Sequence, residues 1–184
     1  MITFNEATHI YKKENVIIPN VTSILGETGI VNCDYFTDEA RERGSHVHTI
    51  CQWHDNLCLD LNSINEDYEP YFQGYLKFLK EVKPIWKNVE SIVYNKEYNY
   101  IGTLDRSGMM FGKDAILDIK TGQMQAWTGL QIAAYEACSE FKHDRYGLQL
   151  NKNGTYKLKP YKDKTDFKIF LNALNLYNWK RNNK

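Results

Sequence analysis

The chain has 184 residues, of which 42% are hydrophobic, 14% aromatic and 25% charged, and its 23 Lys and Arg residues balance 23 Asp and Glu residues. This composition excludes a disordered chain and is typical of a globular protein, so we expect residues 1–184 to form a single domain. The absence of a signal-like start and of any uncharged apolar run near the roughly 20 residues of a membrane span predicts a cytoplasmic protein without a membrane partner.

The first third of the chain is predicted to combine a hairpin with helices. The patterns of apolar and turn residues indicate strands over residues 4–11 and 16–18 with a turn at 12–15, a short helix ending at Leu25, and a loop over 26–32. Thr22 or Ser23 can cap the short helix, because a hydroxyl oxygen accepts a hydrogen bond from a free backbone amide. Thr37 is the predicted cap of a long helix that runs to about Leu59.

The long helix has a polar and an apolar face. The polar face carries Arg41, Ser45, His48 and Gln52, and apolar contacts come from Val47, Ile50, Cys51 and Cys58. His46 points elsewhere. On its own, His48 is most simply a hydrogen-bonded histidine on a helix.

A second helix and a strand follow a polar linker over residues 62–67. The helix covers residues 68–83 and ends before Pro84. Its aromatic stripe has helical spacing and is predicted to lie in the core; it consists of Tyr71, Tyr75, Phe78 and Leu79. Residues 89–95 alternate as a strand with Glu90 at its start.

Two further strands flank a turn rich in glycine and charge, one ending at Asp105 and the other at Lys120. Because side chains alternate along a strand, Asp118 and Lys120 share one face while Ile119 points into the core. A strand-end salt bridge worth about 0 to 1 kcal/mol is the simplest alternative explanation for this pair. It leaves Asp105 unexplained.

The remaining elements are a helix, a hairpin and a last helix. Their predicted ranges are 127–141 for the first helix, 145–150 and 154–160 for the strands, and 164–181 for the last helix, with Phe167, Phe170, Leu171 and Leu174 buried. Gln131 and Tyr135 share one face of the first helix. The order of elements predicts an α/β fold with a mixed central sheet flanked by helices and a helical amino-terminal part.

Charge is distributed unevenly along the chain. Residues 142–184 contain 11 Lys and Arg against 3 Asp and Glu, a net charge of +8, so residues 1–141 carry −8. A basic part beside an acidic body suits a nucleic acid and divalent cations. The lysines can equally serve only to solubilise the terminal helix and hairpin, and composition leaves both interpretations open.

Four motifs follow one another in a fixed order: Arg43-Gly-Ser-His-Val-His48, Gly102-Thr-Leu-Asp105, Asp118-Ile-Lys-Thr-Gly122 and Gln131-Ile-Ala-Ala-Tyr135. The Asp-x-Lys pattern alone is weak evidence, since similar triplets start at Glu81, Glu140 and Asp166. Together the motifs resemble the RecB-like branch of the PD-(D/E)XK nucleases, whose small stand-alone members include phage-type exonucleases and the mitochondrial genome maintenance exonuclease. The resemblance extends over roughly residues 18–136, and Ile18-Pro-Asn-Val-Thr-Ser-Ile-Leu25 resembles their amino-terminal segment.

This resemblance implies a restriction-endonuclease-like core and a set of roles. Asp105, Asp118 and Lys120 would be catalytic, and Mg²⁺ or Mn²⁺ would be held by His48, Asp105, Asp118 and the carbonyl of Ile119. Substrate contacts would come from Arg43, Thr121, Gln131 and Tyr135. Glu90 matches a family carboxylate only loosely, so it either supports these ligands or lies on the surface.

The implied activity is metal-dependent hydrolysis of phosphodiester bonds at the ends of linear DNA, in phage-type recombination or processing and with a recombination protein as a partner. Strand preference stays open, single-stranded DNA being one option. An endonuclease with the same site and a non-catalytic nucleic-acid-binding subunit are the alternatives. Because an imidazole ligand is lost on protonation, activity is expected to fall as the pH drops through about 6.5.

The cysteines Cys33, Cys51, Cys58 and Cys138 lack the paired spacing of zinc sites and are predicted to be buried thiols. Some relatives in the RecB-like branch hold an iron–sulfur cluster through one cysteine before the nuclease motifs and three near the carboxyl end. No cysteine follows Cys138 here, so we expect no iron–sulfur cluster.

Overall fold

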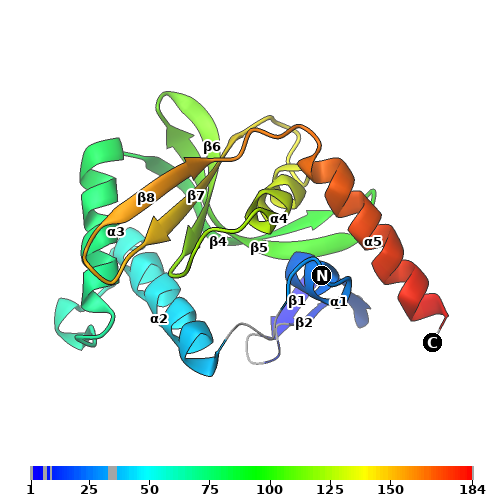
Figure 1. Cartoon of the computed structure of the whole chain (residues 1–184), viewed down its shortest axis with the longest axis horizontal. Helices are drawn as coiled ribbons and strands as arrows, with labels where there is room; N and C mark the ends of the chain where they lie inside the picture. The colour runs from blue at the N-terminus through cyan, green and yellow to red at the C-terminus, as the bar shows by residue number, and fades with distance from the viewer. Residues whose placement is uncertain (1, 6–7, 9, 33–36, 184) are drawn as a thin grey trace.

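A mixed five-stranded sheet runs through the centre of the molecule (Figure 1). The computed structural model describes residues 2–5, 8, 10–32 and 37–183. The strands lie in chain order across the sheet: β4 (Ile85–Asn95), β5 (Tyr100–Met110), β6 (Lys113–Lys120), β7 (Asp144–Leu150) and β8 (Tyr156–Pro160). Only β6 and β7 pair in parallel within this sheet. The predicted α/β class with a mixed sheet between helices is confirmed.

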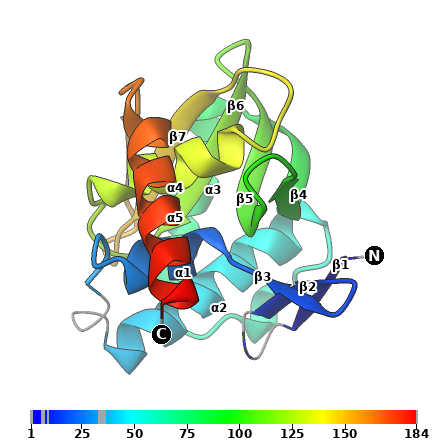
Figure 2. The ribbon, with the colours of Figure 1, turned by 90° about the vertical axis from the view of Figure 1, so that its right-hand side faces the viewer.

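Helices cover both faces of this sheet. On one face, α2 (Asp38–Asp55) and α3 (Glu69–Val82) pack on apolar side chains of β6 and β7, among them Leu117, Ile119 and Leu148. On the other face, α4 (Trp127–Glu136) and α5 (Asp166–Asn182) pack together with α1 (Val21–Glu27) (Figure 2). Alternate residues of β6 therefore belong to different cores, because successive side chains point to opposite faces.

A small antiparallel sheet precedes the helices. It consists of β1 (Ile2–Asn5), β2 (Ile10–Lys13) and β3 (Val16–Ile18). The strand predicted over residues 4–11 is thus wrong: the range contains the end of β1, the start of β2 and the turn residue Thr8. After β3, the Ile101 amide donates to the Pro19 carbonyl at 3.0 Å, which attaches the small sheet to β5. The turn between β2 and β3 contains Glu14 and Asn15, both with a positive φ.

Several predicted boundaries need correction. Asn20, and not Thr22 or Ser23, caps α1: its Oδ1 accepts from the Ser23 amide at 2.8 Å, and the helix continues to Glu27. The long helix α2 begins after Thr37 as predicted but ends at Asp55, short of Leu59. Likewise α4 ends at Glu136 rather than at 141. A 3₁₀ turn, Leu61–Ser63, lies in the linker before α3.

The largest correction concerns β5, which does not end at Asp105. It continues to Met110, and the turn to β6 is only Phe111 and Gly112, with φ of 53° and 77°. Two consecutive positive φ angles match the twist of a tight hairpin. Asp105 therefore lies within a long strand.

The aromatic stripe of α3 packs in the core as predicted, with Tyr71, Tyr75 and Phe78 buried. Of the cysteines, Cys51 is buried, Cys138 is partly buried and Cys58 is exposed, so the prediction for Cys58 is wrong. Cys33 lies outside the described residues. Within the described part of the chain, we find no helix with the length and apolar character that crossing a bilayer requires.

Candidate active site

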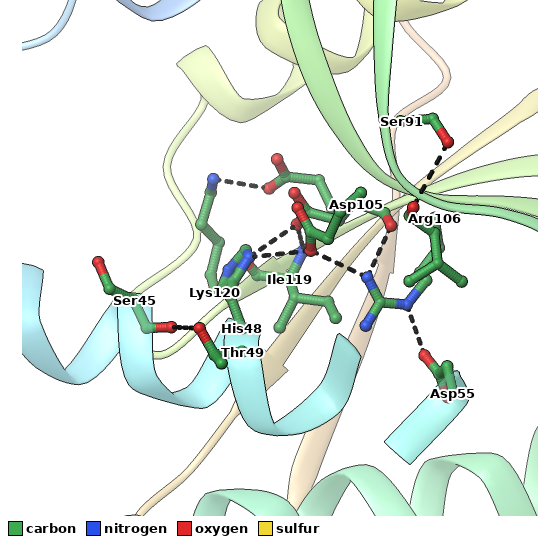
Figure 3. A network of polar contacts seen from close by, with 12 residues as sticks. Ser45, His48, Thr49, Asp55, Ser91, Asp105, Arg106, Ile119 and Lys120 are labelled. Carbon is green, nitrogen blue, oxygen red and sulfur yellow. Dashed lines mark hydrogen bonds and ion pairs between the residues drawn. The ribbon is translucent and has the colours of Figure 1, made fainter. Parts of the chain in front are cut away.

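The candidate site lies where β5 and β6 separate. Their pairing ends at Arg106 and Leu117, so the amide of Ile119 has no partner on β5. The Asp105 side chain takes the place of that partner: its Oδ2 accepts from the Ile119 amide at 2.6 Å. Figure 3 shows this carboxylate, the Ile119 peptide and His48 pointing toward one another. The divergence of the two strands thus creates a polar opening inside the sheet.

His48 reaches this opening from α2. Its Nε2 lies 2.9 Å from the Ile119 carbonyl and donates to it. Its Nδ1 lies 3.7 Å from Glu90 Oε1 and 3.7 Å from Asp105 Oδ2. One ligand atom from each of His48, Glu90 and Asp105 fits within 4.8 Å, as in a metal site. Glu90, for which the sequence left two interpretations, therefore lies beside the predicted ligands rather than apart from them.

The backbone of Glu90 is unusual. Its φ is 45°, which is uncommon for a residue with a side chain and costs conformational energy. The carboxylate is held from the other side by Arg106, whose Nη1 donates to Oε1 at 2.9 Å. Strained residues persist where surrounding contacts fix them, often at functional sites. No local sequence signal identifies this conformation.

Asp118 and Lys120 form the second part of the site. Asp118 is 1% exposed, and its Oδ2 lies 2.8 Å from Lys120 Nζ. Its Oδ1 is buried and has no hydrogen-bond partner within the described ranges. A buried carboxylate oxygen without a donor is costly, so this atom is suited to a ligand that is absent from the protein alone. Ile119 is buried on the opposite face, as strand alternation predicted.

A hydrogen-bonded chain extends from Lys120 to α4. Lys120 Nζ donates to Gln131 Oε1 at 3.2 Å, and Gln131 Nε2 donates to the Tyr135 hydroxyl at 3.0 Å. Gly102 makes room for this chain, because a Cβ at that position would lie 2.6 Å from Tyr135 Cε1. The Gly102-Thr-Leu-Asp105 motif thus needs its glycine for the close approach of α4.

Arg106 is the residue that the sequence analysis missed. Although it is 0% exposed, it is fully charged and contacts three elements. Its Nε donates to Asp55 Oδ2 at 2.6 Å, and its Nη1 donates to Glu90 and to the Asp105 carbonyl at 2.7 Å. The sequence offers a single hint of this role, which is that an arginine directly follows Asp105. Arg106 therefore joins α2, β4 and β5 behind the site.

The charges of the site influence one another strongly. Burial lowers the pKa of His48, but the carboxylates of Asp105 and Glu90 outweigh it and raise that pKa to about 9. Burial also raises the pKa of Asp118 to about 6, against the lowering effect of Lys120. For Asp105, burial is likewise the largest cause of a raised pKa, opposed by His48. Without a metal, the protonated His48 thus partly neutralises Asp105 and Glu90, the carboxylates that a divalent cation would neutralise in its place.

The other predicted substrate contacts lie at the rim. Arg43 Nε is 3.5 Å from Thr121 Oγ1, and its guanidinium lies 5.9 Å from the centre of the Tyr71 ring. Every predicted site residue is thus within one region between α2, the sheet and α4. The basic part of the chain lies outside this region, because described residues 142–184 line neither of the two clefts that open at His48 and Lys120.

No protein-family model matches the sequence, and no curated protein matches it either.

Proposed function

We propose that this chain is a PD-(D/E)XK-type nuclease that uses Mg²⁺ or Mn²⁺ to hydrolyse phosphodiester bonds at DNA ends. The observation that carries the proposal is the convergence of His48 and Asp105 on the peptide of Ile119, which is flanked in the chain by the ion pair of Asp118 with Lys120. Histidine, aspartate and a backbone carbonyl form a mostly oxygen donor set that suits these ions. A structural salt bridge alone would not need the histidine.

The distances support a fit to a small divalent cation. Ligand atoms next to each other in an octahedral shell lie about 3 Å apart, since each is about 2.1 Å from the ion. His48 Nε2 and the Ile119 carbonyl lie 2.9 Å apart, and the buried Oδ1 of Asp118 accepts no hydrogen bond from the described residues. His48, Asp105, Asp118 and the Ile119 carbonyl would hold the ion. Glu90 lies on the Nδ1 side of the ring, so it would support His48 there rather than bind the same ion as Nε2.

When bound, the ion would supply a nucleophilic hydroxide and neutralise charge on the phosphoryl oxygens. The side chains do the positioning. Lys120 lies beside Asp118 in the acidic cluster; burial lowers its pKa, but the carboxylates of Asp118 and Asp105 outweigh this effect and raise it. Held as an ammonium ion, Lys120 would bind a phosphoryl oxygen and orient the attacking water. Gln131 fixes its direction, and Tyr135 fixes Gln131.

The deciding experiment follows cleavage of end-labelled linear single- and double-stranded DNA beside a closed circle, in Mg²⁺, Mn²⁺ or EDTA. The wild type is compared with Lys120→Ala and with Lys87→Ala, which removes an exposed lysine paired with Asp114. We expect linear DNA to be degraded, the circle to survive, and EDTA and Lys120→Ala each to abolish cleavage while Lys87→Ala has no effect.

Other outcomes select the alternatives. Cleavage of the closed circle would identify an endonuclease with the same site. Metal-independent DNA binding without cleavage in either metal would refute the catalytic proposal and identify a binding subunit.

A further inference from the structure

Two clefts meet at the candidate site, and they differ in charge. The acidic cleft, of about 730 Å³, contains Glu90 and Asp105. The basic cleft, of about 650 Å³, lies on the other side of His48 and Lys120; we define it by Ile30, Arg41, Arg43, Lys120, Thr121 and Trp127. Both volumes suit a small-molecule or nucleotide-sized ligand. His48, Gly44 and Lys120 border both clefts.

The basic cleft suits an anion. Arg41, Arg43 and Lys120 line it, and no carboxylate does so among its described lining residues. Arg41 pairs with Asp38 at 3.0 Å, and Lys120 pairs with Asp118. Arg43 differs from them because its neighbour in the cleft is a neutral group, the hydroxyl of Thr121. A guanidinium beside a hydroxyl is a common binding arrangement for a phosphate group.

The same cleft also offers an aromatic surface. Trp127 begins α4, is partly buried, and lies with its ring centre 5.5 Å from Lys120 Nζ. Its indole therefore sits one side chain away from the place where a scissile phosphate would bind. Aromatic rings next to a cationic groove are the usual platforms for unpaired bases. An inorganic anion would need the arginine but not the ring.

Gly44 lines both clefts. It lies inside α2, where glycine weakens a helix relative to alanine. Packing does not require it, because a Cβ there would have only Thr121 Oγ1 within 4 Å, at 3.9 Å. Glycine at this position lowers the stability of the helix and is not required by close packing, so its effect is to leave space where the two clefts meet. That space lies between the predicted metal ligands and the basic cleft.

We propose that the basic cleft binds the nucleotide next to the scissile phosphate, with its base against Trp127 and its phosphate on Arg43 and the Thr121 hydroxyl. This inference rests on the proposed nuclease function and adds the part of the substrate that the site reads: an unpaired base, since a paired base would not be free to stack on the indole. The occupant is therefore a single-stranded segment of nucleic acid.

The test measures binding without cleavage, by fluorescence anisotropy of labelled single-stranded oligonucleotides in EDTA. A set of oligonucleotides carries one abasic residue that is moved along the strand. We expect one position at which the abasic residue weakens binding to the wild type about tenfold, in line with the loss of one base–aromatic stack. Trp127→Leu should bind the intact strand about tenfold more weakly and be insensitive to the abasic residue at that position, whereas Trp127→Phe should restore the sensitivity.

If Trp127→Leu weakens binding of intact and abasic strands equally, the indole only supports Lys120 and the inference is overturned. Gly44 supplies a second test that does not alter Trp127. We expect Gly44→Ala to raise the melting temperature, and Gly44→Leu to fold but to bind oligonucleotides at least tenfold more weakly. Unchanged binding by Gly44→Leu would also overturn the inference.

The two proposals can fail separately. Position-dependent base binding without metal-dependent cleavage would leave the inference standing and refute the nuclease function. Metal-dependent cleavage by a protein whose binding is insensitive to the abasic residue at every position would support the nuclease function and overturn the inference.

Discussion

Asp55 accepts a hydrogen bond from the buried guanidinium of Arg106 at 2.6 Å, and this ion pair fixes α2 against the central sheet. Asp55 lies two helical turns after His48, so both side chains project from one side of α2. Arg106 in turn follows Asp105 on β5 and donates to Glu90 on β4. The pair therefore sets the distance between the histidine and the carboxylates of the candidate site.

Breaking this buried ion pair should lower the free energy of unfolding more than breaking an ion pair on the surface does. Asp55→Ala removes one of the two carboxylates paired with the buried Arg106, which leaves its Nε and the Tyr75 hydroxyl, a donor to Asp55 at 2.6 Å, without an acceptor. We expect the free energy of unfolding to fall by about 3 to 5 kcal/mol, measured by urea denaturation. Asp114→Ala removes the exposed partner of Lys87 and should leave the urea midpoint almost unchanged. Equal losses in the two variants would contradict a structural role for the Arg106 pair.

Metal affinity should rise with pH up to about 9. The pKa of His48 is raised to about 9 by Asp105 and Glu90 despite burial, so at neutral pH a proton occupies a predicted metal ligand. Binding a cation must displace that proton, and below pH 9 the affinity should fall about tenfold per unit of pH. Below about pH 6, protonation of Asp118 should steepen the fall. The fall in activity through about pH 6.5 expected from the sequence assumes the ordinary pKa of imidazole, which the neighbouring carboxylates raise for His48.

Calorimetric titration with Mn²⁺ in buffers of different ionisation enthalpy would count the released protons. We expect about one proton per ion at pH 7.5, and none in His48→Gln, whose affinity should also lose most of its pH dependence. His46→Gln is the matched control, because His46 contacts only its own helix and the Tyr68 ring among the interactions described. Equal affinity at pH 6 and pH 8.5 in the wild type would exclude His48 as a ligand.

Along the hydrogen-bonded chain from Lys120 to Tyr135, the effect of a substitution on cleavage should decrease with distance from the ammonium group. Gln131→Leu removes the acceptor that directs Lys120, and we expect single-turnover cleavage to slow about tenfold, the equivalent of one hydrogen bond. Tyr135→Phe removes a hydrogen bond one step further away and should slow it only about threefold. The reverse order would indicate that Tyr135 contacts the substrate itself.

Much of the site could be predicted because its residues depend on local rules. Strand alternation places Asp118 and Lys120 together, and helical spacing places Gln131 and Tyr135 on one face. Glu90 and Arg106 depend instead on how β4, β5 and α2 meet. The left-handed backbone of Glu90 and the pairing of Arg106 with Leu117 have no local signature. The same pairing carries β5 past Asp105, where the sequence predicts its end.

The uneven charge of the chain was a poorer guide. The basic residues after 141 are on β7, β8, α5 and their loops, whereas the described cationic residues of the basic cleft come from α2 and the end of β6. Chain position does not determine which surface a lysine shares with a site, because the sheet places distant segments side by side. The solubilising role that composition left open is thus compatible with the positions of residues 142–184.

The glycine of the Gly102-Thr-Leu-Asp105 motif supplies a test of how the fold supports the site. A Cβ at Gly102 would lie 2.6 Å from Tyr135 Cε1, too close for any real contact, so Gly102→Ala must displace that ring. We expect a loss of about 1 to 3 kcal/mol in the free energy of unfolding and slower cleavage, since Tyr135 fixes Gln131. Gly122→Ala is the control, because a Cβ there meets nothing within 4 Å.

A double-mutant cycle separates this clash from other effects of the alanine. Tyr135→Ala removes the ring, so adding Gly102→Ala to it should cost much less stability than adding Gly102→Ala to the wild type. The backbone of Gly102 does not have a positive φ, which leaves the clash with Tyr135 as the main reason for a glycine at this position. Additive losses in urea denaturation would show that another contact, such as the one with Val21 at 3.4 Å, requires the glycine instead.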